Sequence, residues 1–296
     1  MNAGADLAPV IASQPLGLLR TSLVMDSLTR LRSVHTIRLL AVIVGGGGMR
    51  GRSFAVAVAV TAVAAISAPA AFANHSWNGY HWARTSNPFT IKLGDNVSGL
   101  WEGMLQTASS DWSQSSVLNT TIVAGGTRPK SCRATLGRVE VCSARYGNTG
   151  WLGVATIWLQ SGTSHIVQGT VKNNDYYFGS SSYQYNNTAE MQHVICQEIG
   201  HTFGLDHQDE SGISLNTCMD YYHNTSATDT KSTHPNSHDY DELSTIYSHL
   251  DSTTTIGSSS LVPTGAVGES RFVTRTSGGL TRVTFVHWAT PIHATF

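Results

Sequence analysis

The sequence is short of charge. Only 12% of its 296 residues are Asp, Glu, Lys or Arg, about half the share in an ordinary soluble domain. The 18 basic and 19 acidic residues nearly cancel, so the formal net charge is -1. No basic field is present that could hold a polyanion. We therefore expect neither nucleic acid nor an anionic membrane surface among its partners.

Long apolar runs are also lacking. The uncharged stretch FAVAVAVTAVAAI at residues 54–66 is too short to cross a bilayer. It follows the basic segment MRGRS and precedes Ala71-Phe72-Ala73, which fits the small-x-small rule of signal peptidase. This order of basic, apolar and small residues is typical of a secretory signal. We predict a signal peptide at residues 49–73, cleavage near Ala73, a secreted extracellular protein and no stable membrane insertion.

The signal begins with its own methionine, so we interpret residues 1–48 as an upstream extension from a start codon assigned too early. Residues 74–250 are predicted to form the main domain. Residues 251–270 read as a linker rich in Ser, Thr and Gly, and residues 271–296 as a C-terminal β-hairpin segment. A hydrophobic content of 41%, with 7 Trp, 10 Tyr and 8 Phe, is enough for a real core and excludes global disorder.

Cysteine is scarce, with four residues that all follow the signal: Cys132, Cys142, Cys196 and Cys218. An even number in a secreted chain predicts two disulfides, for which three pairings are possible. Proximity in the sequence favours a bridge between Cys132 and Cys142 across a short hairpin, which would leave Cys196 with Cys218. No C-x-x-C spacing occurs, which argues against a cysteine zinc site or a redox motif.

Hydrophobic periodicity predicts helices and strands in a definite order. Strands are expected at residues 89–93, 120–124, 139–142, 153–159 and 165–172, and helices at 100–112 and 189–203. Thr188 is the expected N-cap of the second helix. A third helix is expected to begin near Asp239, in capping-box spacing with Glu242, and to bury a stripe that ends at Leu250. This order predicts an α+β fold in which helices pack on one mixed sheet.

The stretch QEIGHTFGLDH at residues 197–207 carries the clearest chemistry. Glu198 and His201 are three residues apart on a predicted helix, so both emerge on one face, which Gln197 shares. Gly204 tolerates the left-handed turn that would bring His207 back to the same point. A metal ion held by Gln197, His201 and His207 would keep one position open for water, with Glu198 beside it as general base.

This stretch resembles the signature of the metzincin clan of zinc endopeptidases, H-E-x-x-H-x-x-G-x-x-H followed by a Met-turn. Only the first histidine departs from the pattern, because Gln197 replaces it. Downstream, Cys218-Met219-Asp220-Tyr221 matches the Met-x-Tyr turn. The element order over residues 88 to 250 also resembles a matrixin-like catalytic domain.

The resemblance implies a zincin domain with a mixed twisted sheet, an active-site helix, a Met-turn and a C-terminal helix. It implies a Zn2+ cofactor, a protein or peptide substrate and a monomer. Met219 would lie beneath the metal, and Tyr221 would support the oxyanion. An edge strand, for which residues 153–159 are the candidate, would pair with the substrate. Cys196 adjoins the first metal position and Cys218 adjoins Met219, so a bridge between them would tie the helix to the Met-turn.

Gln197 leaves two functions open. An amide oxygen is a weaker, neutral donor than imidazole, so the affinity for zinc should fall without activity necessarily being lost. The first hypothesis is a secreted zinc endopeptidase. The alternative is a metzincin-like pseudoenzyme that binds a peptide or surface partner with little or no metal. A structural zinc domain would need a fourth protein ligand, to which the sequence does not point.

Other polar residues allow two interpretations each. His193 lies eight residues before His201, about 12 Å along a helix, so we expect it at the surface or behind the ligands. Asp206 and Asp209 flank His207 and could ligate, orient it or be solvated. Residues 234–239 could hold a second ion or simply pack before a helix. Residues 173–175 could bind Ca2+, as matrixin-like domains often do. The remaining histidines without a spacing partner, expected to be ordinary, are His75, His81, His165 and His223.

Overall fold

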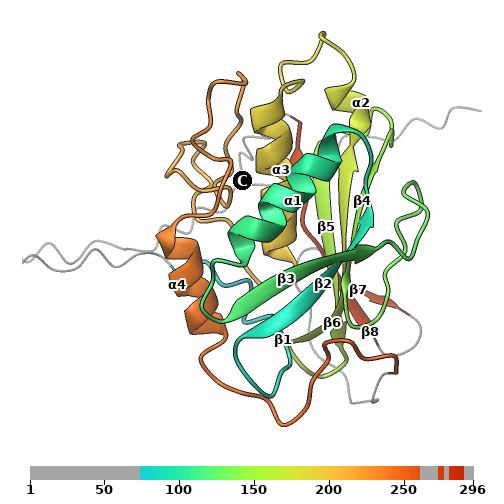
Figure 1. Ribbon diagram of the computed structural model, residues 1–296, viewed down its shortest axis with the longest axis vertical. Helices are drawn as coiled ribbons and strands as arrows, with labels where there is room; N and C mark the ends of the chain where they lie inside the picture. The colour runs from blue at the N-terminus through green and yellow to red at the C-terminus, as the bar shows by residue number, and fades with distance from the viewer. Residues whose placement is uncertain (1–73, 261–272, 277–279, 290–296) are drawn as a thin grey trace, which may run out of the picture. The chain divides into compact units, whose positions relative to one another are not determined.

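The computed structural model describes residues 74–260, 273–276 and 280–289 (Figure 1). The predicted extension and signal peptide at residues 1–73 lie outside this range. Four helices occur in the described part: α1 (Leu100–Trp112), α2 (Asp175–Phe178), α3 (Thr188–His201) and α4 (Ser237–Ile246). Its strands are β1 (His81–Trp82), β2 (Phe89–Asn96), β3 (Leu118–Ala124), β4 (Val139–Ala144), β5 (Trp151–Gln160), β6 (His165–Asn174), β7 (Val273–Thr276), β8 (Leu280–Thr284) and β9 (His287–Trp288).

All nine strands form one mixed sheet, which confirms the predicted α+β class. Its order is β3-β2-β4-β6-β5-β8-β7, with β1 on β6 and β9 on β5. The pairs from β3 to β6 are parallel, whereas β5, β8 and β7 pair antiparallel. β4 is buried along almost its whole length, as expected of a parallel strand with neighbours on both sides.

Helices α1 and α3 cross the same face of the sheet (Figure 1). Their contact is anchored by buried indoles. The Trp112 Nε1 donates to the main-chain carbonyl of Cys196 at 3.1 Å, and the Trp82 Nε1 donates to that of Thr202 at 2.9 Å. Each large apolar ring therefore also satisfies its one polar atom in the core. These contacts fix α3, which carries the motif, against the sheet.

α1 has the predicted bounds, whereas the ends of α3 and α4 differ from the predicted ones by one to four residues. α3 is capped by Asn187 rather than Thr188, and α4 by Asn236, three residues before Asp239. In both caps an asparagine side chain accepts from main-chain amides of the first turn, and in α4 Asp239 completes the capping box. α4 ends at Ile246, so Leu250 lies beyond it and is 57% exposed. The predicted burial of Leu250 is therefore wrong.

The C-terminal strands add to the far side of β5. β7 and β8 form an antiparallel hairpin, and β8 pairs with β5 so that Thr284 lies opposite Thr156. β9 continues this addition and places His287 opposite Gly153. In this structure β5 is therefore not a free edge, and the expectation that a substrate finds an open edge there is wrong. The two outer strands bury the apolar Val283, which accounts for their attachment.

Two disulfides join Cys132 to Cys142 and Cys196 to Cys218, the pairing preferred from the sequence. The second one links α3 to the turn that contains Met219. In the described part of the chain, no helix has the length and apolar character needed to span a bilayer.

Candidate functional site

The turn after α3 brings His201 and His207 together. Gly204 has a φ of 97°, and a Cβ at this position would lie 1.9 Å from the carbonyl oxygen of Tyr80. Only glycine can occupy such a place, because it has neither the Cβ nor the conformational restriction of other residues. The chain therefore reverses tightly, and the two imidazole rings meet with centroids 4.9 Å apart.

Hydrogen bonds fix which nitrogen of each imidazole is free. The His201 Nδ1 lies 2.9 Å from the carbonyl oxygen of Leu205, and the His207 Nδ1 lies 3.1 Å from the Glu210 Oε1. These oxygens accept, so both Nδ1 atoms donate and both Nε2 atoms keep a lone pair. Burial also lowers the pKa of His201 well below its usual value, which keeps this ring neutral. Metal-binding histidines are commonly oriented in this way.

Glu210 is a residue that the sequence interpretation missed. The two flanking aspartates bind main-chain amides instead: Asp206 accepts from the His207 amide at 2.8 Å and Asp209 from the Ser211 amide at 2.8 Å. Neither therefore orients the imidazole of His207. A carboxylate three residues after a histidine in a loop gives no recognisable signal, because its direction depends on the loop itself.

Glu198, three residues before His201 on α3, is completely buried. Neither of its carboxylate oxygens has a hydrogen-bond partner among the described residues. A Cβ on Gly153 of β5 would lie 2.7 Å from its Oε1, so the carboxyl rests directly on the strand. Burial raises the pKa of Glu198 well above its usual value, and the nearby main-chain amides of Ala155 and His287, which are not in hydrogen-bond geometry, oppose this shift only in part. A carboxyl with such affinity for protons suits general base chemistry.

Gln197 faces a different set of partners. Its Nε2 donates to the Asp220 carbonyl oxygen at 2.8 Å, and its Oε1 accepts from the His287 Nδ1 at 2.5 Å. The Asp220 carbonyl can only accept, which fixes the orientation of the amide group. The oxygen still has a second lone pair, so the role of Gln197 as a metal ligand stays a prediction.

Met219 and Tyr221 both contact parts of the predicted site. Met219 is buried beneath α3, and a Cβ on Gly200 would lie 2.5 Å from its sulfur. The Tyr221 ring is 5.2 Å from the His207 ring, centroid to centroid. Its buried hydroxyl has no hydrogen-bond partner in the described part of the chain, and burial raises the pKa of Tyr221 to about 12. The phenol is thus a neutral donor at physiological pH.

The C-terminal segment covers the imidazoles of His201 and His207 with the ring of Phe285. The ring stacks on His201 with centroids 4.0 Å apart and an interplanar angle of 5°, and meets the His207 ring edge-on at 5.5 Å. Its amide donates to the Ala155 carbonyl of β5 at 2.8 Å. A ring on the face of an imidazole leaves the in-plane lone pair of Nε2 free. Phe285 nevertheless occupies space that a bound peptide would need.

A second histidine cluster lies at the other end of α3. The buried carboxylate of Glu190 faces His193 at 3.6 Å, His287 at 3.7 Å and His223 at 2.6 Å. His193 is completely buried, which excludes the surface position and leaves the predicted alternative, a position behind the ligands. The neighbouring imidazoles outweigh the burial of Glu190 and hold its pKa well below its usual value. Burial lowers the pKa of His287 to about 3.

Several groups of histidines and carboxylates in the described residues are close enough to bind a metal ion. These four groups are Glu190, His193 and His287; Asp206, His207 and Glu210; His75, His238 and Asp239; and His81, His249 and Asp251. His165 also contacts the last group, with its Nε2 3.2 Å from Asp251. The histidines expected to be ordinary therefore each face a carboxylate that is distant in the sequence.

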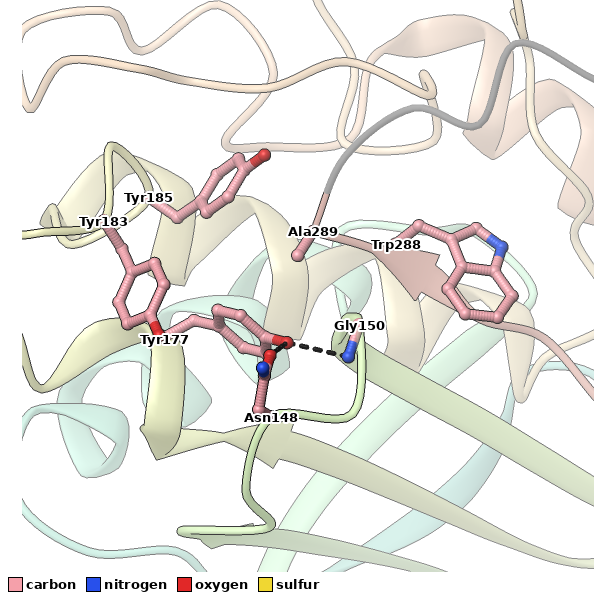
Figure 2. Close-up of a pocket in the computed structure, with 7 residues that line it drawn as sticks. All are labelled: Asn148, Gly150, Tyr177, Tyr183, Tyr185, Trp288 and Ala289. Carbon is pink, nitrogen blue, oxygen red and sulfur yellow. Dashed lines mark hydrogen bonds between the residues drawn. The ribbon is translucent and has the colours of Figure 1, made fainter.

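A pocket of about 390 Å³ lies next to the Glu190 cluster. Its wall is largely aromatic, and β9 contributes Trp288 (Figure 2). The Tyr177 hydroxyl is fixed by the Gly150 amide and the Asn148 side chain, as the dashed lines in Figure 2 show. Tyr185, also in the wall, has its ring centroid 5.0 Å from that of His223. The C-terminal segment therefore forms one side of this pocket.

The residues predicted to bind Ca2+ have structural contacts. The Asn174 Oδ1 accepts from the amides of Tyr146 and Tyr176, and the Asp175 Oδ1 accepts from the Trp101 indole at 2.6 Å. These contacts cap α2 and tie it to α1. The calcium site stays a prediction.

No protein-family model matches the chain, and no curated protein matches it. The function must therefore be argued from the site itself.

Proposed function

We propose that this protein is a secreted, zinc-dependent endopeptidase of the metzincin kind. One observation carries the proposal. The imidazoles of His201 and His207 meet with an Nε2 free on each ring, and the same helix carries a buried carboxyl, Glu198, that has no hydrogen-bond partner among the described residues. Two oriented nitrogen donors next to a potential base are the parts required for hydrolysis assisted by a metal.

The donor set fits a zinc ion. His201 and His207 would hold it, with the second lone pair of the Gln197 oxygen as a weaker third donor. When bound, zinc would supply Lewis acidity to a peptide carbonyl and to water. The site combines neutral ligands with a buried acid, so the pKa of Glu198 should fall once a cation is near.

The remaining steps belong to the side chains. Glu198 would accept a proton from the attacking water and deliver it to the leaving amine. The Tyr221 hydroxyl, which has no partner among the described residues, would donate to the oxyanion that develops on the peptide carbonyl. β8 indicates how a substrate would bind, because it already lies antiparallel along β5. An extended peptide would take this place after the C-terminal segment has moved away.

Hydrolysis of a peptide library by the zinc-loaded full chain tests the proposal. Glu198→Gln should lower kcat at least about 100-fold, the usual cost of losing a general base, with zinc content unchanged. Glu242→Gln provides a matched control, because Glu242 is also buried and also carries a raised pKa, and should keep full activity. Equal hydrolysis by the wild type and Glu198→Gln would contradict the proposal.

A second candidate is a binding protein that lacks catalysis. It is favoured by the two hydrogen bonds that engage the amide of Gln197 and by the stacking of Phe285 on His201. This candidate predicts no zinc at His201 and His207 and no hydrolysis by the wild type. Under this candidate, Gln197→His would create zinc binding and hydrolysis. A functional peptidase would show zinc binding and hydrolysis without this change.

A further inference from the structure

We propose that Glu190, His193 and His287 bind a second divalent transition-metal ion, which fastens β9 to α3. This inference goes beyond the proposed peptidase, because none of the three residues belongs to the motif that ends at His207. It rests on the direction of the lone pairs around one buried carboxylate.

The tautomer of His193 follows from its neighbour. Its Nε2 lies 3.1 Å from the Asp220 carbonyl oxygen, which can only accept, and 3.5 Å from the Gln197 Nε2, which can only donate. The shorter contact assigns the proton to the His193 Nε2. The lone pair of the neutral ring is then on Nδ1, which is buried and has no hydrogen-bond partner among the described residues. This nitrogen faces the Glu190 Oε2 at 3.6 Å. Without a cation between them, two electron-rich atoms would face each other.

His287 repeats the arrangement from the opposite side. The same Asp220 carbonyl fixes the Gln197 amide, whose oxygen must receive the Nδ1 proton of His287. The free lone pair is therefore on Nε2, which is also buried without a hydrogen-bond partner in the described part. It faces the Glu190 Oε1 at 3.7 Å. Gln197 thus orients His287 as a carbonyl or carboxylate orients a metal-binding histidine.

The spacing agrees with metal ligation better than with hydrogen bonds. Separations of 3.6 and 3.7 Å between nitrogen and oxygen exceed hydrogen-bond length. Two ligands on zinc, each at about 2.0–2.1 Å in tetrahedral geometry, lie about 3.3–3.4 Å apart. Small side-chain movements would close the difference.

The carboxylate is already held in place for this role. The Glu190 Oε1 accepts from the His223 Nδ1 and its Oε2 accepts from the Asn224 amide, both at 2.6 Å. Ligating carboxylates are commonly fixed by such outer hydrogen bonds. Two imidazoles and one carboxylate suit Zn2+, Co2+ or Ni2+ rather than Ca2+ or Mg2+.

The ion would join distant parts of the chain. His193 belongs to α3, whereas His287 begins β9, which pairs with β5 beside Glu198. A bound ion would therefore hold the C-terminal segment over the motif. Its removal should loosen β8 and β9 and so favour the displacement that a peptide substrate needs.

Co2+ titration of the chelator-stripped full chain tests the proposal, because its visible absorption reports the geometry of the site. The background variant His201→Ala/His207→Ala removes the other centre and should still bind Co2+. Adding His193→Ala should raise the Kd by more than about 100-fold, since loss of an outer hydrogen bond alone costs 10- to 100-fold. His234→Ala is the matched control: its side chain is 55% exposed and pairs only with Asp111, so it should leave the Kd unchanged.

His287→Ala provides a second variant outside α3, in case His193→Ala disturbs the helix. It should raise the Kd in the same way with an unchanged circular dichroism spectrum. Co2+ binding that survives both substitutions would overturn the proposal and place the ion elsewhere. A folded background variant that binds no Co2+ would also overturn it, and would show that the cluster is held by protons alone. Because the motif histidines are absent from this background, failure of the peptidase proposal leaves the result unaffected.

Discussion

The two buried carboxyls near the ends of α3 have pKa values that are shifted in opposite directions. Glu190 and Glu198 are both fully buried, two turns apart on one helix. The pKa of Glu190 is well below its usual value, whereas the pKa of Glu198 is well above it. The difference comes from donors: Glu190 accepts from His223 and the Asn224 amide, while Glu198 has no hydrogen-bond partner among the described residues. Burial alone favours the protonated acid, and hydrogen bonds reverse this preference.

The largest expected effect on stability comes from replacing the two buried carboxyls of α3 with amides. Glu190→Gln should lower the free energy of unfolding by about 3–5 kcal/mol, because it breaks a buried charged network. Glu198→Gln should not lower it, because the amide replaces a carboxyl that has no such network and whose raised pKa already costs stability at pH 7. Urea unfolding at pH 7 measures both. Equal losses in the two variants would contradict the comparison.

Loss of the Cys196–Cys218 bridge should have the next largest effect. The bridge closes a loop of 22 residues between α3 and the Met-turn. The double variant Cys196→Ala/Cys218→Ala should lower the free energy of unfolding by about 3 kcal/mol through the entropy of the unfolded chain. Thermal unfolding without reductant checks this. Reduction of the wild type breaks both bridges, so it should lower the stability by at least as much. A change below about 0.5 kcal/mol would show that the bridge does not stabilise the motif.

Removing the ring of Phe285 should loosen the C-terminal cover of the motif. Phe285→Ala should lower the free energy of unfolding by about 1–2 kcal/mol, less than for a core phenylalanine because the ring is only half-buried. Amide exchange in β8 and β9 should become faster, and cleavage of peptides should increase. Unchanged exchange in these strands would show that the stacking on His201 does not hold them.

The smallest expected effect is the pH dependence of the free energy of unfolding. Its sign should differ between the contributions of Glu190 and Glu198. For Glu198 the folded pKa is raised, so the folded state binds the extra proton and wild-type stability, relative to Glu198→Gln, should fall as pH rises above 4.5. For Glu190 the folded pKa is lowered, so its stabilisation should be full above 4.5 and be lost as pH falls below it. Unfolding of the metal-free variants between pH 3 and 8 measures both slopes. Slopes of the same sign would contradict the assignment.

Local patterns predict much of this fold, and distant contacts explain what they miss. The helix of residues 188–201 and the return of His207 follow from apolar spacing and from Gly204, all within one short stretch. The cluster at Glu190 cannot be found in this way, since His223 is 33 residues away and His287 is 90 residues from Gln197. β5 and β8, which pair with each other, are also far apart in the sequence. It depends on burial of Val283 in a segment that otherwise reads as an isolated hairpin.

The central claim is that α3 carries two separate metal centres, one at each end. The most direct test is the zinc content of the full chain after dialysis, measured for the wild type, for His201→Ala/His207→Ala and for His193→Ala. The account predicts that the wild type holds one more equivalent than each of the two variants, and that combining the variants removes both. Zinc content that is the same in all of them would contradict it.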